Sequence, residues 1–505
     1  MRNFIILTHR YLGIPLSVLF VVWFLSGIGM IYGGGIPSLA AKERLQHLKA
    51  LDLSLVRITP ADAAAISGVA RSVRQASLLS VLGRPAYRFN DLSDTPITVF
   101  ADSGEIFDGV DRDEGASIAA EFLLQSAQDI RYAGTVTEPD QWTLTEQQYL
   151  PLYRYDWNDE HATSAYVSPS RAEVVLVTTR QSRTLAWLSA IPHWFYFTPL
   201  RVRQPVWYRL VVWTSAAGCA VAALGLFLAV AQFRKTKPFR IADSVRYRGW
   251  SAWHYCTGAV FGIFVLTWIF SGLLSMDPFE WTNRTGLAIQ PEPLAGEPGA
   301  FADYARIAGT RLRSIPGIPD AVRIDFDRIH GEPFFVSHRP DTAGISPTLV
   351  HARTLAVRSA PFPVEDALAG IRSRTDALIA DHELLSEFDA YYYDRDGDTT
   401  LPVLRVKFDD PEQTWIYIEL ERGKIVHRTH RFGRIKRWLF NGLHSLDFSF
   451  WYHRRPLWDL GVILLSLGGL TTSALGLFLG FRRIAIAVSR SLRKEPLADK
   501  NPPLG

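Results

Sequence analysis

Cysteine is nearly absent from this chain, which has only Cys219 and Cys256 among its 505 residues. Both lie in long apolar runs, so the polar parts of the sequence have no disulfide framework and no C-x-x-C redox motif. The C-x-x-C-H motif for covalent haem attachment is missing as well. Walker and dinucleotide-binding fingerprints do not occur, which argues against ATP or NAD(P)H binding. Any redox cofactor would therefore have to be held non-covalently.

Aspartate, glutamate, lysine and arginine are absent from four long runs of the sequence. These runs are Tyr11–Ala41, Leu210–Phe233, Gly249–Met276 and Leu460–Phe481. A membrane-spanning helix needs about 20 predominantly apolar residues, and each run supplies them. The first run lacks an A-x-A cleavage site at the right distance, so we do not expect it to be a cleaved signal. The sequence therefore predicts a multi-pass membrane protein with four transmembrane helices.

Positive charge is concentrated next to these runs and predicts their orientation. The link between the second and third runs contains Arg234, Lys235, Lys237, Arg240, Arg246 and Arg248, and the fourth run is followed by Arg482, Arg483, Arg490, Arg493 and Lys494. Short basic loops remain in the cytoplasm. We therefore expect both termini in the cytoplasm of a bacterial inner membrane, with the two large segments in the periplasm. The net charge of +4 arises in these loops and gives no support to nucleic-acid binding.

The two halves of the sequence resemble each other. At a shift of 251 positions, the run A-L-G-L-F-L at 223–228 recurs at 474–479, and His193 aligns with His444. At a shift of 245 positions, His9 aligns with His254. Ordered matches at rare residue types indicate a duplication, in which each half consists of a helix, an exported domain and a helix. Parallel repeats share an axis along the membrane normal, so matched residues are expected at the same depth.

The predicted fold class is an α+β membrane protein with four transmembrane helices, arranged as two tandem helix–domain–helix repeats with two α+β periplasmic domains. In the domains, strands are expected at Ser164–Ser168 and Ala321–Asp327, for example, and a helix at Val364–Arg372. The expected divisions are transmembrane helices at 4–33, 205–233, 249–276 and 456–481, periplasmic domains at 34–183 and 277–434, interfacial helices at 184–204 and 435–455, a basic cytoplasmic loop at 234–248 and a basic cytoplasmic tail at 482–505.

Four histidines form two matched pairs, and they are the candidate cofactor-binding residues. His9 and His254 lie at the cytoplasmic starts of the first and third helices, whereas His193 and His444 lie in aromatic, weakly charged segments on the exported side. Neutral imidazole ligates haem iron, and facing bundle helices are an ordinary place for such ligands. A single histidine at a helix start could instead contact lipid headgroups. Two pairs, one at each membrane face, favour axial ligation of haem iron by all four.

Some neighbouring residues allow more than one interpretation. Gly13 and Gly258 follow the inner histidines and suit either close helix packing or clearance for a flat macrocycle. Trp23 and Trp268 are expected to anchor the helices at the interface, although they could also lie between two cofactors. Arg203, Arg454 and Arg455 suit haem propionates or lipid phosphates. His453 has no counterpart in the first half, so it ranks behind the paired histidines.

Several motifs resemble the PepSY-associated transmembrane family. They are H-R-Y-L-G at 9–13, W-x-x-S-G at 23–27 and R-W-L-F-N-G-L-H at 437–444, while I-T-P-A-D-A-A at 58–64 and P-V-E-D-A at 363–367 are similar to the PepSY-domain helix. The resemblance covers nearly the whole chain and is weaker in the domains. It implies PepSY-like periplasmic domains and an iron-uptake protein similar to the ferric-siderophore reductases, with b-type haems between the helices.

Three functions follow from these observations. The leading one is transmembrane electron transfer through two haem b groups, from a cytoplasmic or quinol donor to a periplasmic acceptor such as a ferric siderophore. The second is a cofactor-free binding or regulatory protein, in which PepSY-like domains recognise an exported partner and the histidines are replaceable. The third is a transporter, but four helices offer little room for alternating access. Membrane lipid is an expected partner. The sequence does not identify the electron donor or the siderophore.

Overall fold

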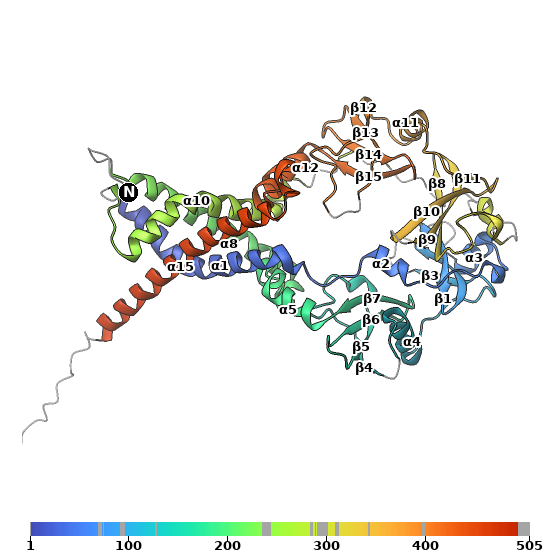
Figure 1. Ribbon diagram of the computed structural model, residues 1–505, viewed down its shortest axis with the longest axis horizontal. Coiled ribbons are helices and arrows are strands. Elements are labelled where there is room, and N and C mark those ends of the chain that lie inside the picture. Colours follow the sequence, from blue (N-terminus) through green and yellow to red (C-terminus); the bar gives the residue numbers. More distant parts are fainter. Residues whose placement is uncertain are drawn as a thin grey trace, which may run out of the picture. The chain divides into compact units, whose positions relative to one another are not determined.

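A computed structural model describes residues 2–68, 73, 75–90, 96–126, 129–234, 244–282, 286, 287, 289, 301–308, 313–341, 344–395 and 399–492. The chain divides into two compact units, each made of segments from both halves (Figure 1). The membrane unit comprises Met1–Ile36, Thr184–Asn283 and Ile435–Gly505. The sheet unit comprises Pro37–Arg183 and Arg284–Arg434.

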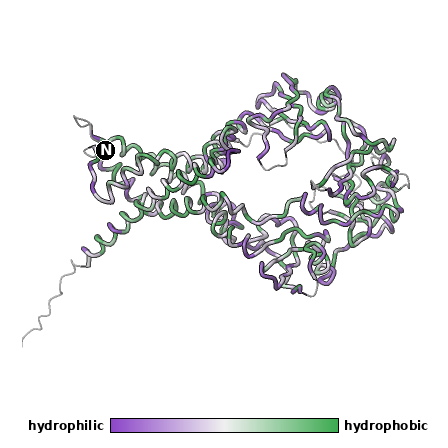
Figure 2. Tube along the Cα trace, in the orientation of Figure 1, coloured by the Kyte–Doolittle hydropathy of each residue, from purple (hydrophilic) through white to green (hydrophobic). Residues whose placement is uncertain are grey.

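Four long helices form the membrane unit, in agreement with the four predicted spans. They are α1 (Arg2–Gly33), α8 (Gln204–Ala231), α10 (Trp250–Ser275) and α15 (Leu457–Leu492). All four are long and apolar enough to cross a membrane, and Figure 2 shows their predominantly hydrophobic residues. The shortest has 26 residues. That length extends about 39 Å at a rise of about 1.5 Å per residue, which exceeds the hydrocarbon thickness of about 30 Å.

The fourth helix is longer than its apolar run. Although the sequence predicts a span of 456–481, α15 continues to Leu492 and includes Arg482, Arg483 and Arg490. Alanine, leucine and arginine all favour helix, so nothing in the local sequence ends α15 where its apolar run ends.

Close packing of aromatic and small residues holds the bundle together. Helix α1 packs against α15 and α8, and α10 packs against the same two helices. The buried core contains Phe20 and Phe24 of α1 and Val265 and Ile269 of α10. A Cβ atom at Gly469 would overlap the ring of Phe24. Glycine at this position therefore allows α15 to approach α1 closely.

Short helices replace the two expected interfacial helices. They are α5 (Arg180–Leu188), α6 (Ala190–Trp194), α7 (Thr198–Arg201), α12 (Arg431–Lys436), the π-helix η7 (Arg437–Gly442), α13 (Leu443–Ser445) and α14 (Ser449–Tyr452). Helix α6 ends at Phe195 with φ of 53°, and α13 ends at the matched Leu446 with φ of 49°. A left-handed residue reverses the chain at a helix end. The breaks therefore fall just after His193 and His444.

The largest sheet of the sheet unit has seven antiparallel strands in the order β11-β10-β9-β8-β1-β2-β3. Its strands are β1 (Gln75–Val81), β2 (Arg84–Asn90), β3 (Ile97–Phe100), β8 (Arg323–Ile329), β9 (Glu332–Asp341), β10 (Gly344–His351) and β11 (Val357–Arg358). Strand β1 pairs with β8, so that Ser77 lies opposite Asp325. The two segments predicted as separate periplasmic domains therefore share one sheet and one hydrophobic core, which includes Leu78, Tyr87, Phe326 and Phe335.

The sheet unit also has two four-stranded antiparallel sheets. Their strands are β4 (Ile130–Val136), β5 (Leu152–Trp157), β6 (Ser164–Ser168) and β7 (Glu173–Thr178) in one, and β12 (Ile379–Leu385), β13 (Val403–Phe408), β14 (Trp415–Glu419) and β15 (Lys424–Thr429) in the other. The unit also contains α2 (Ala41–Gln46), α3 (Pro60–Ser67), α4 (Arg112–Leu123), α11 (Val364–Arg372) and the 3₁₀ segments η1 (Leu53–Leu55), η3 (Gln147–Tyr149) and η5 (Ala302–Ala308). The α+β class is confirmed, and the bounds of β6 and α11 are those predicted.

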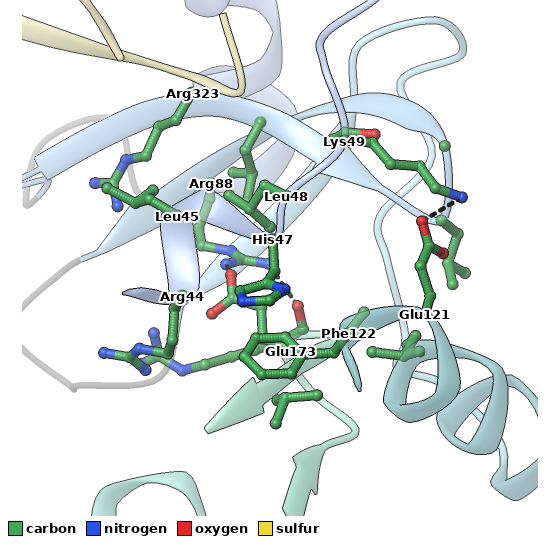
Figure 3. A pocket seen from close by; sticks show the side chains of 18 of the residues that line it. Arg44, Leu45, His47, Leu48, Lys49, Arg88, Glu121, Phe122, Glu173 and Arg323 are labelled. Atoms are coloured by element: carbon green, nitrogen blue, oxygen red, sulfur yellow. Dashed lines mark hydrogen bonds and ion pairs between the residues drawn. The ribbon is translucent and has the colours of Figure 1, made fainter. Parts of the chain in front are cut away.

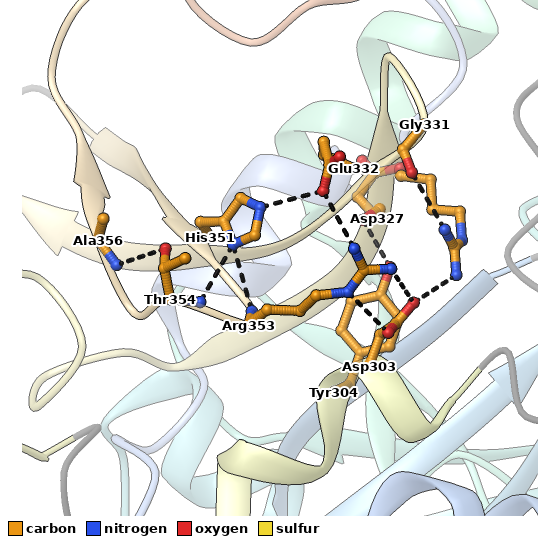
Figure 4. A network of polar contacts seen from close by, with 10 residues as sticks. Asp303, Tyr304, Asp327, Gly331, Glu332, His351, Arg353, Thr354 and Ala356 are labelled. Atoms are coloured by element: carbon orange, nitrogen blue, oxygen red, sulfur yellow. Dashed lines mark hydrogen bonds and ion pairs between the residues drawn. The ribbon is translucent and has the colours of Figure 1, made fainter.

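A polar network fastens η5 to the large sheet (Figure 4). Asp303 of η5 accepts hydrogen bonds from Arg328 of β8 at 2.7 Å and from Arg353 at 2.9 and 3.1 Å. Glu332 contacts His351 at 3.2 Å and Arg353 at 3.5 Å. Hydrogen bonds between charged groups are stronger than neutral ones, so Asp303 stabilises the attachment of η5 to the sheet.

Candidate functional site: two facing histidine pairs

The inner pair joins the first and third long helices. His9 lies on α1 and His254 on α10, and both side chains are partly buried. Their ring centroids are 6.5 Å apart, with an angle of 33° between the ring planes. The two residues come from different halves of the sequence, and the bundle brings their rings close together.

A backbone carbonyl fixes each inner imidazole. The Nδ1 atom of His9 lies 3.0 Å from the carbonyl oxygen of Val221, and Nδ1 of His254 lies 3.0 Å from that of Thr472. A carbonyl oxygen can only accept, so each Nδ1 must carry the proton. In a neutral imidazole the other nitrogen, Nε2, then has a free lone pair. Metal-ligating histidines have this same tautomer and the same kind of outer partner.

The outer pair is built from the short helices. His193 of α6 and His444 of α13 have ring centroids 6.1 Å apart and an angle of 71° between the ring planes. Nδ1 of His193 lies 3.1 Å from Ser26 Oγ, and Nδ1 of His444 lies 3.0 Å from Ser271 Oγ and 3.1 Å from the carbonyl oxygen of Trp268.

Both serine hydroxyls donate to carbonyl oxygens of their own helices. Ser26 donates to Val22 and Ser271 donates to Trp268. Each hydroxyl oxygen can therefore accept a proton from the neighbouring imidazole Nδ1, which again leaves Nε2 as the ligating nitrogen.

Burial keeps the outer imidazoles neutral. It lowers the pKa of His193 to about 4, with a smaller contribution from the neighbouring His444. Burial lowers the pKa of His444 as well. Both rings are therefore unprotonated near neutral pH and available as ligands.

A glycine lies against each of the four rings. A Cβ atom would lie 2.9 Å from Cε1 of His9 if added at Gly225, 3.2 Å from His254 at Gly476, 3.3 Å from His193 at Gly27 and 3.5 Å from His444 at Gly272. Real Cβ atoms almost never approach another atom as closely as 2.9 Å. Glycine at 225 therefore provides space for the imidazole of His9.

The spacing of the pairs fits two axial ligands of one iron. A metal–imidazole bond is about 2.0 Å long and the ring centroid lies about 1.1 Å beyond the nitrogen, so two opposed imidazoles have centroids about 6 Å apart. The observed values are 6.5 and 6.1 Å. If a haem bound at either pair, the two imidazoles of that pair would be the residues that hold its iron. Both pairs therefore fit bis-histidine haem.

The ambiguous residues resolve as follows. Gly13 has Val221 as its nearest neighbour at 3.9 Å, and Gly258 has Thr472 at 3.6 Å, so both glycines pack against helices and contact neither pair. Trp23 packs against Phe20 and Phe195, and Trp268 against Phe24 and Phe264, inside the bundle. Arg455 forms an ion pair with Asp459 and stacks on Trp458, while Arg203 and Arg454 are exposed.

Sequence reasoning identified all four histidines but not the groups that orient them. Gly225 and Gly476 lie in the repeated A-L-G-L-F-L run, but the repeat alone does not indicate that these glycines contact the histidine rings. The carbonyl oxygens of Val221 and Thr472 have no sequence signature. Within the described ranges, no group of three or more His, Cys, Asp or Glu is placed to hold a metal ion. The paired imidazoles are thus the candidate ligands.

The fold and the site define a multi-pass α+β membrane protein whose membrane unit contains two close imidazole pairs. The sequence matches the protein-family model of the PepSY-associated TM region over residues 6–483. The chain therefore belongs to the PepSY-associated transmembrane family, as its motifs indicated. Among curated proteins, none matches it.

Proposed function

We propose that this protein transfers electrons across the bacterial inner membrane through two non-covalently bound b-type haems. His9 and His254 would hold one haem near the cytoplasmic face, and His193 and His444 the other near the periplasmic face. When bound at these positions, bis-histidine haem supplies a reversible one-electron carrier. The observation that supports this most strongly is the spacing of the two ring pairs, 6.5 and 6.1 Å between centroids.

The protein's own groups prepare both sites before any cofactor binds. The carbonyl oxygens of Val221 and Thr472 orient the inner imidazoles, and the hydroxyls of Ser26 and Ser271 orient the outer ones. Outer partners of this kind fix the tautomer and raise the basicity of the ligand. Because these partners belong to packed helices, the rings lose little freedom when they bind iron.

Apolar and aromatic side chains lie between the two levels of the bundle. Phe20, Phe24, Val265 and Ile269 are buried there, and Trp23 and Trp268 border them. His9 and Ser26, which mark the two levels on α1, are 17 residues apart, or about 25 Å at a rise of about 1.5 Å per residue. Two carriers at these levels would span most of a hydrocarbon layer about 30 Å thick.

We further propose that the electrons reach a ferric siderophore in the periplasm. The basic residues of the 234–248 link and of the end of α15 support this orientation, because short basic segments stay in the cytoplasm. The ferric siderophore is chosen as the acceptor because the motifs of this chain resemble those of ferric-siderophore reductases. Reduction to the ferrous complex would weaken iron binding and release the metal.

The test is a single-turnover oxidation of the purified full-length protein. We expect the dithionite-reduced protein, freed of reductant, to be re-oxidised by a ferric trihydroxamate complex while a ferrous chelator gains colour in proportion. The His193→Ala variant should lose this reaction, whereas His453→Ala should retain it. Haem that is present but not re-oxidised would contradict the siderophore assignment. A preparation without haem would contradict electron transfer and favour the cofactor-free binding protein.

A further inference from the structure

The sheet unit contains a cavity of about 370 Å³ that no step of electron transfer requires. Residues from α2 and the segment after it, from β1, β2 and α4, and from the turn before β7 line this cavity (Figure 3). Pockets for small organic ligands typically have volumes of about 300–1,000 Å³. The cavity is thus large enough for a small organic molecule.

Cations outnumber carboxylates in the lining. The lining cations are Arg44, Lys49, Arg88, Arg171 and Arg323, and the lining carboxylates are Glu114, Glu121 and Glu173. Arg88 and Glu173 form a largely buried ion pair, and Lys49 lies 2.9 Å from Glu121. Arg323 donates to Asp325, which lies outside the lining, at 2.6 Å.

Arg44 and Arg171 approach the same aromatic ring. Their guanidinium carbons lie 5.3 and 4.9 Å from the ring centroid of Tyr149, and Arg44 Nη1 donates to the Tyr149 hydroxyl at 3.2 Å. Contact with an aromatic face holds a planar guanidinium in place. Two guanidinium groups held in this way can bind a carboxylate from two directions.

Electrostatics at this position favours an anion. Burial lowers the pKa of Arg171, and the positive charges of Arg88 and Arg44 lower it further. The pKa of Glu173 is lowered although burial acts to raise it, because Arg88, Arg44 and Arg171 surround its carboxylate. The positive groups that stabilise the Glu173 carboxylate can also stabilise a second carboxylate beside Arg44 and Arg171.

The lining also contains aromatic and apolar side chains. His47 stacks on Phe122 with centroids 4.1 Å apart, and leucine side chains, including Leu45 and Leu79, line the same cavity. Figure 3 places His47 and Phe122 facing each other close to Arg44 and Glu173. A ligand that matches this mixed lining has a carbon skeleton as well as negative charge, which disfavours a bare inorganic ion.

We propose that this cavity binds a small organic anion with at least two carboxylate groups. One carboxylate would contact Arg44 and Arg171, and the second would reach Lys49 or Arg323 across the cavity. The assignment rests on the sheet unit alone and holds whether or not the membrane unit binds haem.

Calorimetric titration of the full-length protein in detergent with citrate, at fixed ionic strength, tests the proposal. We expect saturable binding that weakens at least tenfold in Arg44→Gln and in Arg171→Gln. Glu121→Gln should tighten binding severalfold, because it removes the carboxylate that neutralises Lys49. Arg131→Gln is the matched control, since Arg131 is outside the lining and its side chain is 78% exposed.

Three results would overturn the assignment. The first is the absence of saturable citrate binding to the native protein. The second is an equal loss of affinity in Arg131→Gln and Arg44→Gln, which would indicate general charge attraction. The third is inorganic phosphate binding as tightly as citrate, which would show that the site needs charge but no carbon skeleton. Because Glu121→Gln is expected to gain affinity, misfolding of an arginine variant cannot imitate the predicted pattern.

Discussion

The imidazole rings of His193 and His444 lie edge-on to each other with centroids 6.1 Å apart, although 251 positions separate the two residues in the chain. The rings of His9 and His254 are similarly close at 6.5 Å, although the angle between their planes is 33° instead of 71°. In each pair, Nδ1 contacts an oxygen atom on a packed helix, which leaves Nε2 for a ligand. Two sites with the same chemistry thus occur at two levels of one bundle.

Removal of a single paired histidine should empty one site and leave the other. For His9→Ala and for His444→Ala we expect about one haem per chain instead of about two, because one imidazole alone cannot complete bis-histidine ligation. Pyridine haemochrome content relative to protein measures this ratio. His453→Ala is the matched control, because His453 contacts the ring of Tyr452 and belongs to neither pair. Full haem content in His9→Ala would exclude the inner pair as ligands.

Gly225→Ala should disturb the inner site selectively. The added Cβ would lie 2.9 Å from His9 Cε1, so either the ring or helix α8 must move. Because a small displacement of an orienting contact costs a metal site about 10- to 100-fold in affinity, we expect haem to dissociate faster from this site alone. Transfer of haem to apomyoglobin measures the rate. Gly13→Ala, whose nearest neighbour is 3.9 Å away, is the comparison and should behave as the native protein.

Asp303→Asn should destabilise the sheet unit in a pH-dependent manner. Hydrogen bonds from Arg353 and Arg328 hold the pKa of Asp303 below its ordinary value. The contribution of the Asp303 carboxylate to the free energy of unfolding is therefore complete above its unfolded-state pKa of about 3.9. It is lost as the pH falls through the lower pKa of the folded state.

The free energy of unfolding should fall by about 1–2 kcal/mol at pH 7, and the difference from the native protein should shrink below about pH 4. Thermal unfolding at several pH values measures this. Glu332→Gln is the control, because Glu332 is 54% exposed and an ion pair at such a position contributes little to stability. A difference that grows in acid would contradict the assignment.

Much of the membrane unit could be predicted from the sequence. Charge-free runs located all four helices, because a bilayer excludes charged residues over a length of about 20 residues. Matched positions in the two halves identified the histidines, since both members of each pair occur in equivalent motifs. The length of α15 could not be predicted, because its continuation to Leu492 depends on helix propensity rather than on hydropathy.

The shared sheet could not be predicted. Strand β1 (Gln75–Val81) has a short mixed sequence, and its partner β8 lies almost 250 residues later in the chain. Pairing over such distances depends on tertiary packing that no local pattern encodes. The cavity near Arg44 and Arg171 was missed for the same reason. Its lining comes from segments spread between residues 41 and 323, none of which has a recognisable motif.

The absorbance difference between the reduced and the oxidised protein tests the central claim most directly. The protein is expressed with ample haem, purified in detergent and compared with a His9→Ala/His193→Ala double variant. The account predicts the bands of low-spin b-type haem at about two haems per chain in the native protein, and their loss in the variant. A native protein without these bands, or a double variant that retains them, would contradict it.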